Sequence, residues 1–184
     1  MTRGDRPGGS VSRRRLLASA GALAAGLAGC GSSGGTRTNP EFRAADADVL
    51  DGLLGLENRA IAAYVEAARL LAGPHRALVL RIGVQEAAHA YAVTGAIYRL
   101  GGVPTPAAAT YAFTARDGPS ALALAAEVED MSIAHGIDIL PKLSDLEARG
   151  TVVGIANNDA QHAVLIAQAR GLPELPTAVV RGRA

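Results

Sequence analysis

The sequence predicts an all-α fold, a four-helix bundle with one long crossover between its second and third helices. Of the 184 residues, 49% are apolar but only 3% are aromatic. Alanine and leucine dominate over β-branched residues, which argues against a β-sandwich or barrel. Helical periodicity recurs in four segments joined by a short, a long and a short connection. The length suits one domain of ordinary size.

The four segments are delimited by glycine and proline. Asn39 can cap a helix that has Pro40 in its first turn, and Gly73-Pro74 separates this helix from the next. We expect helices at residues 40–72, 75–100, 120–148 and 152–170, the third opening after Asp117-Gly118-Pro119. Gly52 and Gly55 are the points at which the first would be interrupted, and Pro141 predicts a kink or break in the third. Residues 149–151 are expected to form the turn before the fourth helix, and residues 171–184 an irregular tail.

The connection lengths predict the topology. The first and last connections have only a few residues, so each should join an antiparallel helical hairpin. The middle connection, about residues 101–118, is longer than compact domains usually allow for a structureless loop. It is long enough to run from one end of the bundle to the other. The sequence therefore predicts one long crossover, with the bundle occupying residues 40–170.

Residues 1–29 have the pattern of an export signal. The basic run Ser12-Arg13-Arg14-Arg15 precedes an apolar stretch from Leu16 to Gly29. This stretch is shorter than the roughly 20 residues of a membrane span. The Ser-Arg-Arg sequence resembles a twin-arginine signal, and Leu27-Ala28-Gly29-Cys30 resembles the bacterial lipoprotein box.

In that box the cysteine is lipidated after cleavage. The alternatives are a plain cleaved signal or an uncleaved anchor, with Cys30 incidental. If Cys30 is lipidated, residues 30–39 would form a flexible tether. We expect a chain exported by a twin-arginine-type route and lipid-anchored on the extracytoplasmic face of the cell membrane.

Charge and cysteine content exclude several classes of function. The net charge of +1 gives no reason to expect a nucleic-acid partner. The leader is strongly basic, so the remainder of the chain is mildly acidic. A single cysteine excludes an internal disulfide and any CxxC metal or redox motif.

Six polar residues fall on the predicted inward faces of the four helices. On the second helix Glu86 and His89 share one face, because residues three apart are neighbours on a helix. The apolar periodicity of the third helix selects Glu129 over Glu127 as the inward residue. The full set is Glu57, Glu86, His89, Glu129, Asp159 and His162.

Four buried carboxylates would repel one another strongly unless something positive lay between them. Carboxylate oxygen and imidazole nitrogen together suit iron, manganese or zinc. A single Glu-x-x-His is weak evidence, because a partly exposed pair with a hydrogen bond looks the same. Asp159 could also form a polar cluster with Asn157 and Asn158, and His162 could be an ordinary core histidine. The ordered set, one element per helix, favours a metal site.

The order Glu, Glu-x-x-His, Glu, Asp-x-x-His resembles that of di-iron and di-manganese bundles. Over about residues 40–170 the chain resembles the ferritin-like superfamily, closest in style to bacterial proteins related to rubrerythrin and bacterioferritin. The resemblance implies two iron or manganese ions as cofactors. Glu57 and His89 would bind one metal, Asp159 and His162 the other, with Glu86 and Glu129 as candidates for bridging. It also implies that Tyr64 lies close to the metals, as a catalytic candidate or as a core residue.

One position departs from the family pattern. Asp159 stands where the pattern has Glu and is shorter by one methylene. The fourth helix would have to approach more closely, or Asp159 would bind through water, or the second metal would be held weakly.

Two functional hypotheses follow. The first is a dimetal oxidoreductase with ferroxidase or peroxide-consuming activity and an unidentified electron donor. The second is a non-catalytic lipoprotein that keeps the bundle as a scaffold, or that binds metal without turnover. Either could be a homodimer, and in both the partners are metal ions and the membrane reached through the lipid anchor.

Overall fold

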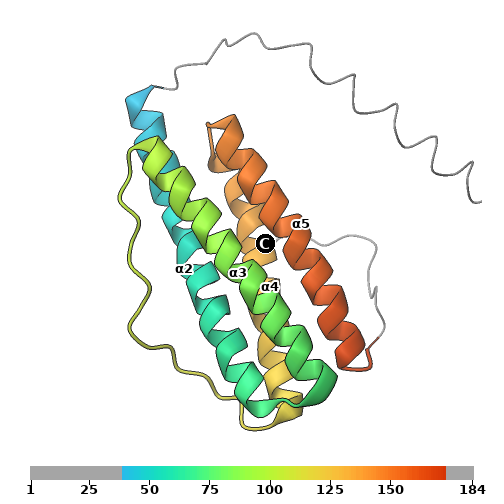
Figure 1. The fold of residues 1–184 in the computed structure, drawn as a ribbon. Coiled ribbons are helices and arrows are strands. Elements are labelled where there is room, and N and C mark those ends of the chain that lie inside the picture. Colours follow the sequence, from blue (N-terminus) through green and yellow to red (C-terminus); the bar gives the residue numbers. More distant parts are fainter. Residues whose placement is uncertain (1–38, 173–184) are drawn as a thin grey trace, which may run out of the picture. The chain divides into compact units, whose positions relative to one another are not determined.

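A computed structural model describes residues 39–172 and shows an all-helical bundle over that range (Figure 1). Its four long helices are α2 (Pro40–Leu70), α3 (Gly73–Leu100), α4 (Gly118–Ile139) and α5 (Leu146–Ala169), with a 3₁₀ turn η1 (Leu140–Lys142) after α4. The predicted four-helix bundle is confirmed. The export signal, Cys30, the tether up to residue 38 and the tail from residue 173 lie outside the described residues.

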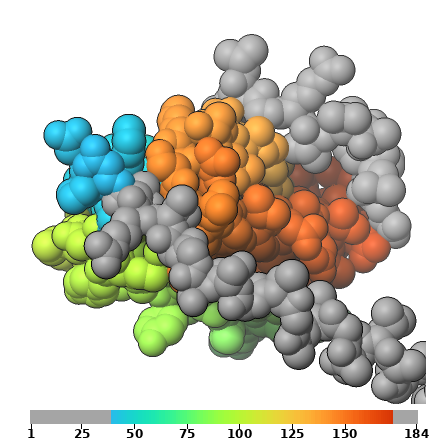
Figure 2. All heavy atoms as spheres, turned by 90° about the horizontal axis from the view of Figure 1, so that it is seen from above, coloured from blue at the N-terminus to red at the C-terminus, as the bar shows by residue number. Residues whose placement is uncertain are grey.

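The predicted topology is also found. α2 and α3 form an antiparallel hairpin, residues 101–117 return along the length of the bundle, and α4 and α5 form a second hairpin (Figure 1). α2 packs against α3 and α4, and α5 packs against the same two helices. The end-on view in Figure 2 shows the blue start of α2 beside the yellow-green end of α3, with the orange of the second hairpin next to them. α3 and α5 are also in contact.

The crossover is attached to the outer side of α2. The side chain of Asp51 accepts hydrogen bonds from the backbone N–H of Thr105 at 2.8 Å and from its hydroxyl at 2.5 Å. Farther along, the guanidinium of Arg59 lies 5.4 Å from the centre of the Phe113 ring, a cation–π contact. These contacts hold the long connection against α2 and leave the outer side of α3 uncovered by it.

The core consists of two apolar clusters. One contains Leu50 and Leu53 of α2 with Val93 and Ile97 of α3. The other contains Ala63 and Tyr64 of α2 with Ile82 of α3, Leu122 of α4 and Ile166 of α5. On each helix the inward polar residues lie in sequence between the members of these clusters, so the core contains a polar layer between two apolar halves.

Two expectations about helix boundaries were wrong. The break between the third and fourth helices lies at residues 140–145, and residues 149–151 are helical. Pro141 lacks an N–H and falls in η1, so α4 ends at Ile139. Asp145 then caps α5 by accepting from the N–H of Ala148 at 2.8 Å, which places Gly150 inside the helix. α2 is continuous through Gly52 and Gly55.

A buried carboxylate fixes the start of α5. Asp46 of α2 is 1% exposed, and its oxygens accept hydrogen bonds from the backbone N–H of Ser144 and, at 2.7 Å, of Asp145.

Within residues 39–172 no helix is long and apolar enough to cross a lipid bilayer.

Replacing Asp46 tests this connection. Asp46→Ala leaves the N–H groups of Ser144 and Asp145 without their acceptor, and hydrogen bonds to a charged group contribute about 1.5–3 kcal/mol each. We expect the free energy of unfolding to fall by about 2–4 kcal/mol, measured by urea denaturation. The exposed neighbour Asp48 is the matched control, and an equal effect of Asp48→Ala would contradict this explanation.

Candidate metal centre

The structure brings all six predicted polar residues together in the middle of the bundle. Glu57, Glu86, Glu129 and Asp159 are at most 1% exposed, His162 is 2% exposed and His89 is 9% exposed. The alternative residue of α4, Glu127, has a side chain that is 59% exposed. The apolar periodicity therefore selected the inward glutamate of α4 correctly.

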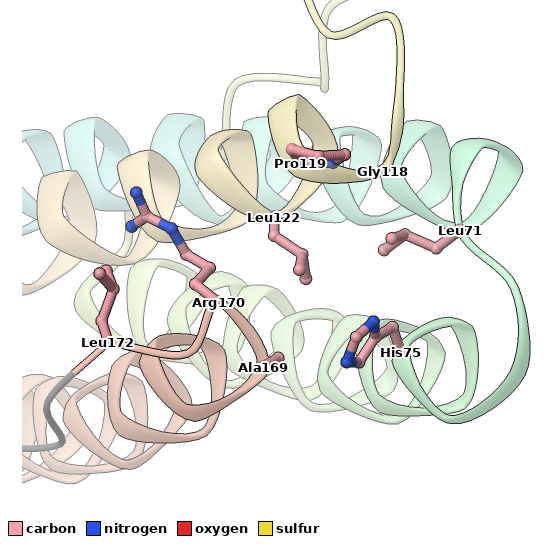
Figure 3. A pocket seen from close by; sticks show the side chains of 8 residues that line it. All are labelled: Leu71, His75, Gly118, Pro119, Leu122, Ala169, Arg170 and Leu172. Atoms are coloured by element: carbon pink, nitrogen blue, oxygen red, sulfur yellow. The ribbon is translucent and has the colours of Figure 1, made fainter.

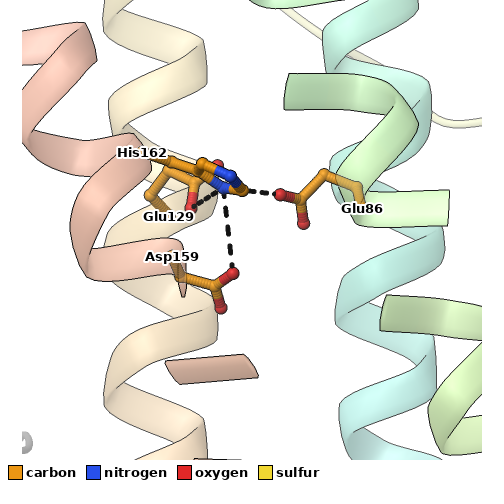
Figure 4. Close-up of side chains that lie close together, drawn as sticks. All are labelled: Glu86, Glu129, Asp159 and His162. Carbon is orange, nitrogen blue, oxygen red and sulfur yellow. Dashed lines mark ion pairs between the residues drawn. The ribbon is translucent and has the colours of Figure 1, made fainter. Parts of the chain in front are cut away.

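The first group of side chains surrounds His162. Glu86, Glu129, Asp159 and His162 each offer a ligand atom within 4.8 Å of the others (Figure 4). His162 Nδ1 lies 2.9 Å from Glu86 Oε1, 3.5 Å from Glu129 Oε2 and 3.9 Å from Asp159 Oδ1.

The second group surrounds His89. Glu57, His89 and Asp159 also have ligand atoms within 4.8 Å of one another. His89 Nδ1 lies 3.2 Å from Asp159 Oδ1, 3.5 Å from Glu57 Oε2 and 3.6 Å from Glu86 Oε2. The two imidazole rings are 5.9 Å apart and nearly parallel.

Two carboxylates face both histidines. Glu86 directs Oε1 towards His162 and Oε2 towards His89. Asp159 Oδ1 lies within 4 Å of both Nδ1 atoms. Neither oxygen of either carboxylate has a hydrogen-bond partner within residues 39–172.

The other two carboxylates are each held on one side only. Ser132 of α4 donates a hydrogen bond to Glu57 Oε1 at 3.1 Å, and the hydroxyl of Tyr64 on α2 donates one to Glu129 Oε1. In both glutamates the second oxygen, Oε2, points into the cluster and has no hydrogen-bond partner among the described residues. Each of these two carboxylates therefore has one oxygen fixed and one available.

Each histidine is held by an amide side chain from the helix that carries the other histidine. His89 Nε2 on α3 lies 2.9 Å from the amide oxygen of Asn158 on α5, and His162 Nε2 on α5 lies 2.6 Å from the amide oxygen of Gln85 on α3. A carbonyl oxygen only accepts, so each Nε2 carries the proton of the hydrogen bond. In a neutral imidazole this leaves Nδ1 as a lone pair directed into the cluster.

Sequence reasoning missed three of these supporting residues: Gln85, Asn158 and Ser132. A signal was present for two of them, because Gln85 and Asn158 each immediately precede an inward carboxylate. Asn158 does not form a surface cluster with Asp159, since Asp159 is fully buried. Ser132 lies three residues after Glu129 on the same inward face, but nothing in the sequence indicated that it holds Glu57.

The shorter side chain of Asp159 still reaches the cluster. One turn before it, Ala156 of α5 lies against Gly136 of α4: a Cβ added to Gly136 would be 3.4 Å from the Cβ of Ala156. The lack of a side chain at residue 136 allows α5 to pack close to α4 at this level. Of the three consequences expected for Asp159, close approach of the fourth helix agrees with the structure.

Burial and mutual repulsion shift the pKa values of the carboxyl groups. Desolvation raises the pKa of Glu57 to about 8 and that of Glu129 to about 7. Desolvation also raises the pKa of Asp159. For Glu86 burial acts in the same direction, but the facing imidazoles of His162 and His89 outweigh it and lower the pKa to about 2.

The histidine pKa values change in the opposite sense to what burial alone would produce. Desolvation lowers them, but the surrounding carboxylates dominate and raise the pKa of His89 to about 12 and that of His162 to about 9. Burial, with Glu129 nearby, raises the pKa of Tyr64. Without cations the cluster thus retains protons on the imidazoles and on two glutamates.

The residues fit a pair of metal ions. Buried polar atoms without a hydrogen-bond partner are rare in folded proteins, yet both oxygens of Glu86 and Asp159, one oxygen of Glu57 and of Glu129, and both Nδ1 atoms lack one here. Each of the six residues has a ligand atom within 4.8 Å of those of its group. The donors are carboxylate oxygen and imidazole nitrogen, a set that suits iron and manganese.

A cavity lies apart from these residues. It has a volume of about 470 Å³ at the end of the bundle where α5 finishes and α3 and α4 begin (Figure 3). Leu71, Leu122 and Ala169 form its apolar wall, and His75 and Arg170 lie at its edge. None of the six clustered residues lines it.

Comparisons with known proteins agree with this fold. The ferritin-like domain family model matches residues 45–172, so the chain belongs to the ferritin-like domain family. Comparison with curated protein sequences gave no match.

Three solved structures illustrate the similarity of fold. A conserved hypothetical protein from Mycobacterium tuberculosis has a TM-score of 0.67 and 18% identity, covering 76% of this chain and 99% of the other. A ferritin-like di-iron carboxylate protein from Bacillus anthracis has a TM-score of 0.60 and 20% identity, covering 70% and 97%. The bacterioferritin of Desulfovibrio desulfuricans, whose structure contains a di-iron site, has a TM-score of 0.62 and 17% identity, covering 79% and 98%.

The pKa shifts predict how the stability of the metal-free chain depends on pH. The pKa of Glu57 rises on folding from 4.5 to about 8, and that of Glu129 from 4.5 to about 7. The pKa of His162 rises from 6.5 to about 9. Folding therefore takes up protons, and the stability that these groups contribute below pH 4.5 is lost as the pH rises towards 9.

We expect the thermal midpoint of metal-free protein to fall by at least about 5 °C between pH 5 and pH 9. Protein loaded with metal should show a smaller fall, because cations replace the protons. Differential scanning calorimetry of the two forms measures this. Parallel curves for the two forms would contradict it.

The amides that hold the histidines can be tested separately. Asn158→Leu removes the acceptor of His89 Nε2, and Gln85→Leu removes that of His162; loss of such outer partners typically weakens metal binding by about 10–100-fold. We expect this loss of affinity in competition titrations with a chelator. Asn157→Leu, at an exposed position beside Asn158, should leave the affinity unchanged.

Proposed function

We propose that this ferritin-like chain binds two iron or manganese ions in the middle of the bundle. One observation carries the proposal: the carboxylate oxygens divide into those with a hydrogen-bond donor and those without one. Of the oxygens without a donor, those of Glu57, Glu86 and Glu129 and the Oδ1 atom of Asp159 lie within 4 Å of an Nδ1 atom.

The same division assigns a role to each residue. Glu86 and Asp159 have both oxygens available and face both histidines, so they would bridge the two ions. Glu57 and Glu129 have one oxygen available, so each would bind a single ion. His89 would complete the ligands of the Glu57 ion, and His162 those of the Glu129 ion.

The surrounding residues prepare the site for redox chemistry. A pair of such ions, when bound, supplies one electron from each metal to an oxidant such as dioxygen or peroxide. Tyr64 keeps its hydroxyl proton at neutral pH and holds Glu129 in place through a hydrogen bond. The apolar clusters on either side exclude water from the carboxylates. These features support ferroxidase or peroxide-consuming activity, in which Tyr64 would hold Glu129 in place through its hydroxyl.

The proposed location follows from the leader. The twin-arginine-like run and Cys30 support export and lipid anchoring at the outer face of the cell membrane. A flexible tether of about ten residues would span at most roughly 35 Å. The metal site would then lie close to the membrane surface.

Metal content and turnover test the proposal together. We expect about two iron or manganese ions per chain after loading, consistent with two ligand groups, and oxidation of Fe(II) faster than in buffer when dioxygen or peroxide is added. Glu86→Ala should remove both ions because it takes away a bridging ligand. Elemental analysis and stopped-flow absorbance measure the two quantities.

Glu127→Ala, an exposed glutamate two residues before Glu129, is the matched control and should keep the full metal content. Fewer than about 0.2 ions per wild-type chain would reject the metal site, given the affinities of structural sites. Full metal content without oxidation by any donor and oxidant pair would instead favour metal binding without turnover.

A further inference from the structure

The cavity at the end of the bundle is separate from the metal centre and has a composition of its own. Its volume of about 470 Å³ lies within the roughly 300–1,000 Å³ of pockets that hold small molecules. All four long helices contribute to its lining, each near one of its ends. A molecule bound there would therefore contact both helical hairpins.

The interior of this cavity is aliphatic. Leu71, Leu122 and Ala169 form its wall. Figure 3 shows the side chains of Leu71 and Leu122 directed into the space, with the ring of His75 across from them. Among the described residues that line it there is no phenylalanine or tyrosine. An alkyl chain would thus find dispersion contacts on several sides, whereas a flat ring would have no aromatic side chain to stack on.

The ionisable side chains at the edge of the cavity are basic. Arg170 and His75 line it, and no acidic side chain does so among the described residues. Arg76, which is exposed and adjacent to His75, adds a further positive charge at this end. Within residues 39–172 neither Arg170 nor Arg76 forms an ion pair. Both guanidinium groups are therefore free to pair with an anion from outside this part of the chain.

The nearby acidic side chains already have partners. Asp117 accepts hydrogen bonds from the backbone N–H and the hydroxyl of Ser120 at the start of α4. Glu66 pairs with Arg69 at 3.2 Å. The helix dipoles give no net sign, because two helices begin and two end here. The unpaired basic side chains therefore determine the sign of the potential at the cavity.

An aliphatic interior with a basic edge is complementary to an anion that carries an alkyl chain. Burying a methylene group strengthens binding by about fourfold. A guanidinium can donate two parallel hydrogen bonds to a carboxylate, and such charge-assisted bonds are stronger than neutral ones. A ligand with a chain and a carboxylate would use both parts of the site, whereas a hydrocarbon or a small anion would use only one.

We propose that this cavity binds an aliphatic carboxylate, such as a medium-chain fatty acid. The chain lies against Leu71, Leu122 and Ala169, and the carboxylate pairs with Arg170, with His75 beside it. None of the six clustered residues lines the cavity, so this binding does not depend on the metal ions.

Isothermal titration calorimetry of dodecanoate into the full, metal-loaded chain tests the proposal. We expect about one molecule per chain, with a dissociation constant below about 100 µM. Decanoate and octanoate should bind more weakly, by about fourfold for each buried methylene that is lost. Dodecyltrimethylammonium has the same chain and the opposite charge, and it should bind at least about tenfold more weakly than dodecanoate.

Variants separate the two parts of the site. Arg170→Ala should raise the dissociation constant for dodecanoate at least about tenfold, because the charge-assisted hydrogen bonds are lost. Arg81→Ala is the matched control: it removes the same charge from an exposed position of α3 that does not line the cavity, and it should leave the affinity unchanged. Ala169→Phe should fill the cavity and abolish binding while Arg170 is kept. Circular dichroism should show the wild-type helical content for every variant.

Three outcomes would overturn the proposal: no binding of dodecanoate up to about 1 mM, equal affinity for dodecyltrimethylammonium, or equal effects of Arg170→Ala and Arg81→Ala. Dodecanoate binding that appears only after truncation at Leu172 would assign the cavity to residues 173–184 instead. Binding confined to phosphatidylglycerol vesicles, and reduced by Arg170→Ala, would assign this end of the bundle to a lipid surface.

The metal site provides an independent control. Glu86→Ala, which is expected to lose both ions, should bind dodecanoate as tightly as the wild type, because Glu86 does not line the cavity. The carboxylate site and the metal site can therefore fail separately.

Discussion

The repulsion among four carboxylates in the core is the constraint on which the rest of the bundle depends. Glu57, Glu86, Glu129 and Asp159 are removed from water at the same level of four helices, where isolated charges are strongly disfavoured. Protons can satisfy the cluster in part, as the raised pKa values of Glu57 and Glu129 show. Divalent cations satisfy it more completely, because they neutralise the charge and use the unpaired oxygens as ligands.

The supporting hydrogen bonds have an approximate two-fold arrangement. α2 supplies Tyr64 to the glutamate of α4, and α4 supplies Ser132 to the glutamate of α2. α3 and α5 exchange amide contacts with each other's histidine in the same manner. Each helix therefore carries both a clustered residue and a support for a residue on another helix. No helix can shift along its axis without disturbing the residues of a second one.

The amides give this support a particular electrostatic character. The outer partners of ligand histidines are often carboxylates, which raise the basicity of the ring. Asn158 and Gln85 are neutral, so they fix the orientation and the tautomer without adding charge to a cluster that already holds four acids. This choice limits the total negative charge that the core must contain.

Much of the fold and the inward cluster could be predicted from sequence, for physical reasons that differ between elements. Helical periodicity placed Glu129 and not Glu127 inside, because one face of α4 is apolar and only one of the two residues lies on it. Pro141 marked the break after α4 as predicted, whereas the start of the fourth helix was expected at residue 152 and lies at Leu146. Asp145 caps this start, and the contact of Asp46 with Ser144 and Asp145 that holds it in place joins residues about a hundred positions apart. The role of Ser132 was hidden for the same reason, since its partner Glu57 is on another helix.

The polar layer also has a mechanical consequence for the whole bundle. It separates two apolar clusters, so cohesion between the halves of the core passes through the ligand plane. Ions bound there would link the two ends of the bundle through their ligands. Without them, each apolar cluster could unfold separately from the other. Ion binding would therefore increase the cooperativity with which the bundle unfolds.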